Sequence, residues 1–340
     1  MIVARRLARL AGFVLLQIVL VVVLLEAVAR IFDPFGISYF SEVARYGDTL
    51  VLEEPIGYRN RPGLDGQFSG VPVRINRLGL RDREIEGKAP GEYRILAMGD
   101  SVPFGIGVRY EDSYPHQLEV LLNERHASRH FRTLNMGVPS YNTEQELIQL
   151  KTLGLSLQPD AVTLFFSSND IEPKLWSRNK LNHWYAYLVQ RSYAGSLVTL
   201  VLQKAFAQIV GGNSRSQDPN ARDTSRVALD QYRLDSPRWQ AIDRSLTEIH
   251  AILKARHVPF VLYSALEQPY IIEMLEGMAR REGILYVNLQ QRKDDPRWAG
   301  LDKRRLRNSV VDGHPSPLGN TVLATLMAES LERHKALGRR

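Results

Sequence analysis

From residue 93 onward, short apolar runs alternate with longer helical patterns, and this alternation restricts the possible fold more than any other feature of the chain. Helical patterns such as Ser113–Arg125, Thr143–Leu153 and Arg238–Arg256 separate the runs, and one at about Leu318–His334 closes the chain. Strands that alternate with helices predict an α/β fold in which helices cover both faces of a parallel sheet. The five predicted strands are Tyr93–Met98, Thr133–Met136, Ala161–Phe166, Phe260–Ser264 and Leu285–Leu289.

The N-terminus has a different character, because a nearly uninterrupted apolar run follows Arg5, Arg6 and Arg9. Residues 10–32 reach the roughly 20 residues that a membrane-spanning helix needs. Arginines in front of such a run predict a cytoplasmic N-terminus. We therefore expect a single-pass, membrane-anchored protein whose residues 37–340 lie outside the cytoplasm, in the periplasm.

A cleavable signal peptide is the alternative interpretation of this segment. The small residues Ala27–Ala29 resemble a cleavage site. We favour a retained anchor because Ile31 and Phe32 extend the apolar run, which places Glu26 and Arg30 at the far membrane interface. Both interpretations export the rest of the chain.

The chain is accordingly expected to have three parts. Residues 1–36 form the membrane anchor or signal peptide, and residues 37–92 form a stalk and a small β extension without chemistry of their own. Residues 93–340 form the main domain, with an insertion at about 171–235. The insertion is apolar and aromatic at first and polar later, so a helical pair packed on the domain is favoured, and a lid or a membrane-resting surface is the alternative.

Composition excludes several classes of protein. The chain has no cysteine, which rules out a disulfide framework, a thiolate metal site and a cysteine nucleophile. Lys and Arg number 44 against 37 Asp and Glu, a net charge of +7, but the basic residues are scattered, so nucleic acid is not an expected partner. The run Lys303–Arg307 is interpreted as a solvated face, or else as a surface that attracts an anionic saccharide or lipid phosphates.

Polar residues follow the predicted strands at the edge where parallel sheets carry their sites. Gly99-Asp100-Ser101 follows the first strand, the segment 135–143 follows the second, and Ser167-Ser168-Asn169-Asp170 follows the third. Near the C-terminus comes Asp312-Gly313-His314-Pro315-Ser316. Each segment alone is a common turn or loop, but together they supply a nucleophile, a base and an acid.

These residue types suit acyl transfer at a serine. A serine hydroxyl needs a base to take its proton, and an imidazole with a pKa near 6.5 is suited to that task. A carboxylate orients the imidazole, and hydrogen-bond donors must face the oxyanion as it forms. Ser101, His314 and Asp312 are the candidate nucleophile, base and acid. The candidate donors are the backbone N–H groups of Ser101 and Ser140 and the side-chain amide of Asn169.

The order Gly-Asp-Ser, a glycine-type turn, Asn-Asp and Asp-x-His resembles the SGNH (GDSL) hydrolase superfamily over about residues 93–335. This resemblance implies a flavodoxin-like, three-layer α/β/α fold with a five-stranded parallel sheet. It also implies ester cleavage or acyl transfer by a Ser–His–Asp triad, which maps onto Ser101, His314 and Asp312. Residues 104–108 and 142–145 look like the membrane-anchored bacterial members.

The sequence departs from that family's pattern at two places. Ser140 stands where a glycine is usual, so the backbone loses freedom if a positive φ is needed there, and Gly137 is the less favoured alternative donor. Asp312 stands two residues before His314 where three is commoner, and Val311 occupies that third position. The shorter spacing resembles branches that transfer or remove O-acetyl groups on polysaccharides, which makes a saccharide acyl ester the preferred substrate.

The predicted function is thus a serine esterase or O-acyltransferase acting on an acyl, chiefly acetyl, ester of an envelope or extracellular saccharide. The alternatives are a lipid or thioester hydrolase and a catalytically silent polysaccharide-binding module. No cofactor or metal is expected. His126 and His130 have ligand spacing but no third ligand nearby. The sequence leaves the oligomeric state open.

Overall fold

The computed structural model describes residues 2–33, 36–171, 192–197, 232–292, 295–298 and 300–338. By their contacts the residues divide into two units. The first comprises Met1–Asp48, Lys180–Gln217 and Ser309–Asp312, and the second comprises the remainder of the chain. Most of the predicted insertion at 171–235 lies outside the described residues.

The second unit contains a five-stranded sheet in which all strands are parallel and the order is β6-β5-β7-β8-β9. The strands are β5 (Glu92–Gly99), β6 (His130–Asn135), β7 (Ala161–Phe166), β8 (Phe260–Ser264) and β9 (Leu285–Asn288). The central strand β7 is buried along its whole length, as a strand covered on both faces must be. The predicted fold class is confirmed.

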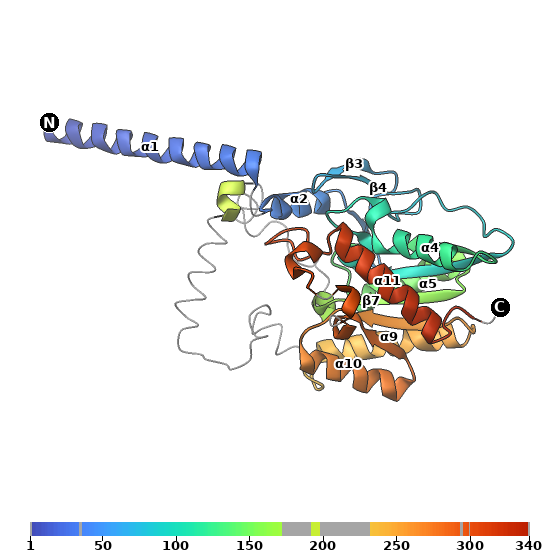
Figure 1. Ribbon diagram of the computed structural model, residues 1–340. Coiled ribbons are helices and arrows are strands. Elements are labelled where there is room, and N and C mark those ends of the chain that lie inside the picture. The colour runs from blue at the N-terminus through green and yellow to red at the C-terminus, as the bar shows by residue number, and fades with distance from the viewer. Residues whose placement is uncertain are drawn as a thin grey trace. The chain divides into compact units, whose positions relative to one another are not determined.

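Helices cover the two faces of the sheet and complete three layers. They are α4 (Tyr114–Arg125) and α11 (Pro317–Arg333) on one face, and α5 (Thr143–Thr152), α9 (Pro237–Lys254) and α10 (Pro269–Glu282) on the other (Figure 1). Because side chains alternate along a strand, Ile95 and Ala97 of β5 pack under α4 and α11, whereas Leu96 and Met98 pack under α5, α9 and α10.

Local sequence signals explain where the helices begin. The side chain of Asn142 accepts a hydrogen bond from the Gln145 N–H and so begins α5 with a capping box. The side chains of Ser236 and Ser316 each accept one backbone N–H at the start of α9 and α11, and each is followed by a proline at the first helical position. Short 3₁₀ turns connect the elements: η1 (Tyr110–Asp112), η2 (Gly154–Leu157), η3 (Ser168–Ile171), η5 (Leu289–Arg292), η6 (Pro296–Trp298) and η7 (Lys303–Leu306).

One strand begins earlier than its apolar run indicates. The sequence predicts a strand at Thr133–Met136, but β6 starts at His130, which pairs with Glu92 of β5. Phe131 is apolar and buried, but the polar and more exposed residues His130 and Arg132 of this edge strand stand on either side of it. A continuous apolar run therefore does not mark the start of β6.

Residues 49–92 form small elements within the second unit. The strands β1 (Val51–Glu53) and β2 (Gly57–Arg59) make one antiparallel pair, and β3 (Asp65–Phe68) and β4 (Val71–Arg74) make another. The first unit contains α1 (Ile2–Phe32) and α2 (Ser38–Gly47). Within the described residues, the stretch Arg9–Phe32 of α1 has a mean hydropathy of 2.7 and is long and apolar enough to cross a membrane, which fits an anchor or a signal sequence.

Asp82 ties residues 49–92 to the sheet, and its loss should destabilise the fold. Its buried carboxylate lies 2.6 Å from the Arg132 guanidinium and accepts the Asn135 N–H at 2.8 Å. Asp82→Ala removes one of the two carboxylates that pair with Arg132, the other being Glu119 at 2.9 Å, and leaves the buried Asn135 N–H without its acceptor. It should therefore lower the free energy of unfolding by about 3 kcal/mol. The exposed Asp65–Arg74 pair provides the control, because Asp65→Ala should cost about 1 kcal/mol or less. Denaturant unfolding of both variants checks this, and equal losses would contradict it.

Candidate active site

Ser101 stands at the carboxyl edge of the sheet, where β5 turns into the short helix α3 (Ser101–Phe104). The turn requires Gly99, whose φ is +140° and whose missing Cβ would lie 2.9 Å from the Phe165 carbonyl oxygen. Asp100 then caps α3 by accepting the Val102 N–H at 3.2 Å. The sequence Gly-Asp-Ser thus presents a half-buried serine at the first turn of a helix.

The carboxylate of Asp100 is fully buried and accepts hydrogen bonds from three side chains as well. Ser101 Oγ donates to it at 3.1 Å, Ser167 Oγ at 3.0 Å and Asn169 Nδ2 at 3.1 Å. The structure shows that Asp100 thereby joins the loop after β5 to the loop after β7.

Two further carboxyl groups, Glu146 and Asp170, are buried near this charge. Burial raises the pKa of Glu146 well above its ordinary value, and the charge on Asp100 raises it further. Within the described chain neither Glu146 oxygen has a hydrogen-bond partner. Burial and the nearby carboxylates also raise the pKa of Asp170, although hydrogen bonds from the Ser167 N–H and the Thr143 hydroxyl oppose this shift. No hydrogen bond from the described residues opposes the effect of burial on Glu146, so the upward shift of its pKa has the clearer physical cause of the two.

The turn after β6 places Ser140 in the left-handed region, with φ +64°. This is the conformation that glycine adopts without strain, so the departure from the family pattern falls on a residue that needs a positive φ. The alternative donor Gly137 already donates its N–H to Asn135 Oδ1 at 3.0 Å. Within the described chain, no hydrogen bond is formed by the backbone N–H of Ser101 or of Ser140.

His314 lies on the returning strand of a hairpin whose base is the bridge between Arg307 and Pro315. The Asn308 N–H donates to the His314 carbonyl at 2.9 Å, and the Asn308 side-chain amide donates to the Ile106 carbonyl at 2.8 Å. The hairpin is thereby fixed to the loop that follows Ser101.

Asp312 belongs to the first unit with the other residues of the hairpin tip. Its carbonyl accepts the Ser309 N–H at 3.2 Å, and its N–H donates to Ser309 Oγ at 2.9 Å. The pairing of Asp312 with His314 stays a prediction.

A cavity of about 860 Å³ in the second unit is lined by Ser101, Asn169 and His314 together. Its apolar wall includes Leu266, Leu289, Trp298, Leu301, Leu323 and Leu326. Two cations, Lys303 and Arg307, also line it, and Glu267 contributes one carboxylate that accepts a hydrogen bond from Gln290. Ser140 is not among the lining residues, although its turn adjoins the serine loop through the Val138 N–H to Gly99 O bond of 3.3 Å.

Residues 97–322 match the model of the GDSL-like lipase/acylhydrolase family, which is more than half of the chain. The chain belongs to this family. No curated protein sequence matches it.

Solved structures with similar folds include further hydrolases. The lipase/acylhydrolase from Enterococcus faecalis is 12% identical, with a TM-score of 0.43 over 71% of this chain and 96% of that one. Axe2, an acetylxylan esterase from Geobacillus stearothermophilus, is 14% identical, with a TM-score of 0.41 over 73% and 95%. LAE5, an α/β hydrolase from the metagenome of Lake Arreo, is 16% identical, with a TM-score of 0.43 over 73% and 97%. These likenesses carry no inference about the substrate of this family member.

Sequence reasoning missed Asp100 and Glu146 as members of the site. The sequence holds a weak signal for Glu146, because it lies three and four residues before Gln149 and Leu150 and so on the same face of α5. These two residues are buried, and a charged residue is unusual on a buried helix face. No signal existed for the link from Asp100 to Ser167 and Asn169, because those residues are more than 60 positions away in the chain.

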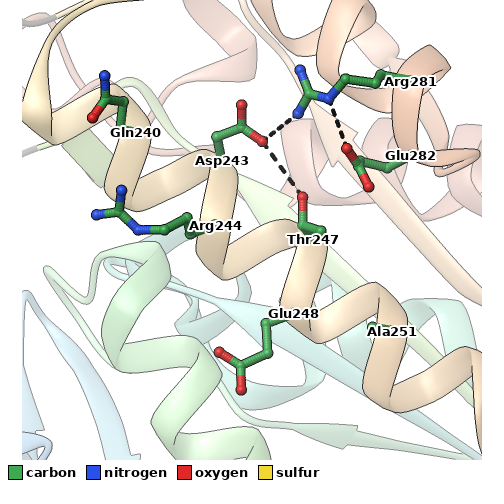
Figure 2. Close-up of a pocket in the computed structure, with 8 residues that line it drawn as sticks. All are labelled: Gln240, Asp243, Arg244, Thr247, Glu248, Ala251, Arg281 and Glu282. Carbon is green, nitrogen blue, oxygen red and sulfur yellow. Dashed lines mark hydrogen bonds and ion pairs between the residues drawn. The ribbon is translucent and has the colours of Figure 1, made fainter.

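A second hollow of about 380 Å³ lies on the outer surface of α9 and α10. Figure 2 shows Arg281 directed at both Asp243 and Glu282, at 2.5 and 2.7 Å, while Thr247 donates to Asp243. Arg281 is therefore paired with the carboxylates of Asp243 and Glu282. The residues that line this hollow do not include a serine nucleophile with a base beside it. This hollow therefore offers no candidate for a serine-dependent reaction.

The raised pKa of Glu146 predicts a pH-dependent stability. A carboxyl group whose pKa is raised by folding contributes fully to the stability of the folded state at pH values below its unfolded pKa of about 4.3. This contribution to the free energy of unfolding is lost as the pH rises through the folded pKa. Glu146→Gln imitates the protonated side chain, so its melting temperature should rise relative to the wild type as pH increases from about 4 to 9. Thermal unfolding across this range measures the difference, and parallel curves would contradict the assignment. Loss of the Glu146 charge also lowers the pKa of Asp170, which changes the difference in the same direction.

Proposed function

We propose that this protein is a membrane-anchored, periplasmic serine esterase or O-acyltransferase whose substrate is an acyl ester of an envelope or extracellular saccharide. The observation that carries the proposal is the convergence of Ser101, Asn169 and His314 on one cavity at the carboxyl edge of the sheet. Membership in an acylhydrolase family supplies the reaction class. The chemistry follows from what these groups can do.

In the first half-reaction, Ser101 Oγ attacks the ester carbonyl carbon while His314 accepts the hydroxyl proton. The C–O bond to the alcohol breaks, the alcohol leaves with the proton from His314, and an acyl-serine remains. In the second half, water or a sugar hydroxyl gives its proton to His314 and attacks the acyl carbon. The bond from this carbon to Ser101 Oγ breaks, Ser101 regains the proton from His314, and the acid or the acylated sugar leaves. Asp312 is proposed to orient His314 and stabilise its protonated form. Ser101 Oγ donates to Asp100 in the free protein, so it must rotate towards His314 when substrate binds.

The negative charge that develops on the carbonyl oxygen needs donors that are already in place. The N–H groups of Ser101 and Ser140 are proposed for this role because no group in the described chain uses them. Asn169 Nδ2 carries two hydrogens, and its bond to Asp100 occupies one of them. The same bond fixes the direction of the other.

The lining of the cavity bears on the substrate. Lys303 and Arg307 have no ion-pair partner among the described residues, which favours a substrate with negative charge, as an acidic saccharide or a phosphorylated one would have. Arg304, between them, is paired with Asp302. The cavity has an apolar wall, and its volume of about 860 Å³ is larger than an acetyl group requires. Hydrolysis of a longer acyl ester or of a thioester is therefore the second candidate function.

Retention of the N-terminal helix is supported by contacts inside the first unit. Glu26 accepts the Ala194 N–H at 2.8 Å and the Ser192 hydroxyl at 2.9 Å, and it pairs with Arg30 at 2.6 Å. The guanidinium of Arg30 lies over the Tyr193 ring at 4.7 Å. Cleavage after Ala29 would remove Glu26 from this set. We therefore propose a retained anchor with the main domain on the periplasmic side.

Replacing the nucleophile tests the proposal directly. Ser101→Ala should abolish ester cleavage and acyl transfer while leaving the melting temperature nearly unchanged, because a half-buried hydroxyl contributes little packing. His314→Ala should cost about as much, since triad members act as a unit. Activity is measured on acetylated polysaccharides and on a series of synthetic esters of increasing chain length, which separates the two candidate substrates. Full activity of Ser101→Ala, or phosphonate labelling at a different serine, would refute the assignment.

Removing the amide of Asn169 tests the oxyanion hole. Asn169→Ala should lower kcat by about 100- to 1000-fold, or about 2.7–4 kcal/mol, with little change in KM. Ser167→Ala is the matched control, because it also removes one donor from Asp100 but none from the proposed oxyanion position. A similar fall in kcat in both variants would show that Asn169 acts only by satisfying Asp100.

A further inference from the structure

We propose that Tyr58, which lies before the region that matches the family, is a positioning residue that orients the Ser140 N–H towards the oxyanion. This inference rests on the proposed function, because it concerns the same reaction. It assigns part of the catalytic geometry to residues 49–60, which the sequence indicates only as a β extension without chemistry.

Tyr58 contacts the peptide group between Pro139 and Ser140 directly. The Tyr58 hydroxyl donates to the Pro139 carbonyl oxygen at 3.0 Å. Pro139 C=O and Ser140 N–H belong to one peptide group, which is planar and, in its trans form, directs the two bonds in opposite directions. A donor that fixes the Pro139 oxygen therefore fixes the direction of the Ser140 N–H. It also polarises that N–H, since hydrogen bonds in a chain strengthen one another.

Tyr58 is itself held in place from several sides. It is 1% exposed, and its own carbonyl accepts the Tyr141 hydroxyl at 2.5 Å, so the two residues bond reciprocally across the turn. Their rings pack edge to face with centroids 5.3 Å apart, in a cluster that includes Ile56 and Val138. Burial, and to a smaller extent the charge on Asp100, raises the pKa of Tyr58, so its hydroxyl remains a donor.

Neighbouring contacts brace the same turn. Asn60 Nδ2 donates to the Gly137 carbonyl at 3.3 Å, and Gln145 Nε2 donates to the Ile56 carbonyl at 2.9 Å. A non-glycine residue at φ +64° persists only where its surroundings determine the conformation. Residues 56–60 provide such surroundings for Ser140, which explains how a serine is tolerated at this position.

Side-chain hydrogen bonds also hold the loop that follows the nucleophile. The guanidinium of Arg81, 1% exposed, donates to the carbonyls of Phe104 at 3.0 Å, Gly105 at 2.5 Å and Val108 at 2.7 Å. Residues 49–85 thus contact both loops that are proposed to supply backbone donors. Tyr58 is the sharper test, because its hydroxyl touches the peptide group of the donor itself.

The experiment compares Tyr58→Phe with Tyr93→Phe in the full-length protein. Tyr93 also donates its hydroxyl to main-chain carbonyls, of Asp160 at 3.3 Å and Ala336 at 3.4 Å, but it stands at the start of β5, at the end of the strand away from Ser101. Both variants should lose a similar, small amount of thermal stability. Only Tyr58→Phe should lose kcat, by about 10- to 100-fold, a loss smaller than the about 100- to 1000-fold expected when an oxyanion donor is removed outright.

Two further readouts separate positioning from general damage. KM should stay within about twofold, because the oxyanion exists only in the transition state. The rate at which a phosphonate, which places a charged oxygen at the same position, labels Ser101 should fall in parallel with kcat.

The outcomes distinguish this inference from the proposed function. If Ser101→Ala is inactive but Tyr58→Phe matches Tyr93→Phe in kcat, the serine mechanism stands and the positioning role of Tyr58 is wrong. A rise in KM at unchanged kcat would likewise overturn it. If Ser101→Ala retains activity, the proposed function fails and this inference falls with it.

Discussion

The buried carboxylate of Asp100 accepts hydrogen bonds from loops that follow two different strands of the sheet. Ser101 and Val102 belong to the turn after β5, and Ser167 and Asn169 belong to the turn after β7. A carboxylate removed from water is costly unless donors replace its hydration. The charge can therefore be kept only if both loops stay together, which makes the position of Asn169 beside Ser101 a consequence of electrostatics rather than of loop length.

The same charge determines the state of its neighbours. Glu146 and Asp170 are buried within its field, and like charges in a medium of low dielectric constant repel strongly. The pKa values of Glu146 and Asp170 are therefore raised. A negative charge next to a serine also opposes the formation of an oxyanion there, so the proposed reaction depends on donors that are aimed away from Asp100. Asn169, which has one hydrogen for each purpose, meets that requirement.

The support of the site extends beyond the region that defines the family. Asp82 binds Arg132 of β6, Arg81 holds the loop after α3, and Tyr58 holds the turn that contains Ser140. These contacts come from residues 49–85, whereas the family match begins at residue 97. In physical terms the functional domain includes this segment, because its side chains satisfy main-chain groups that would otherwise be left unpaired in the interior.

The sequence by itself determined the strand–helix alternation, and the bounds of Ala161–Phe166 and Phe260–Ser264 followed from apolar runs between polar residues. It also predicted Ser101 and Asn169 as site residues from their positions after parallel strands, and His314 from its Asp-x-His pattern; all three line one cavity. It indicated that Ser140 occupies a glycine position, and the structure gives that residue a φ of +64°. Only the tertiary structure decided the rest. The Tyr58–Pro139 bond joins residues 81 positions apart, and the raised pKa of Glu146 depends on its burial near Asp100. Such contacts arise from packing between distant segments, and no local pattern of residues encodes them.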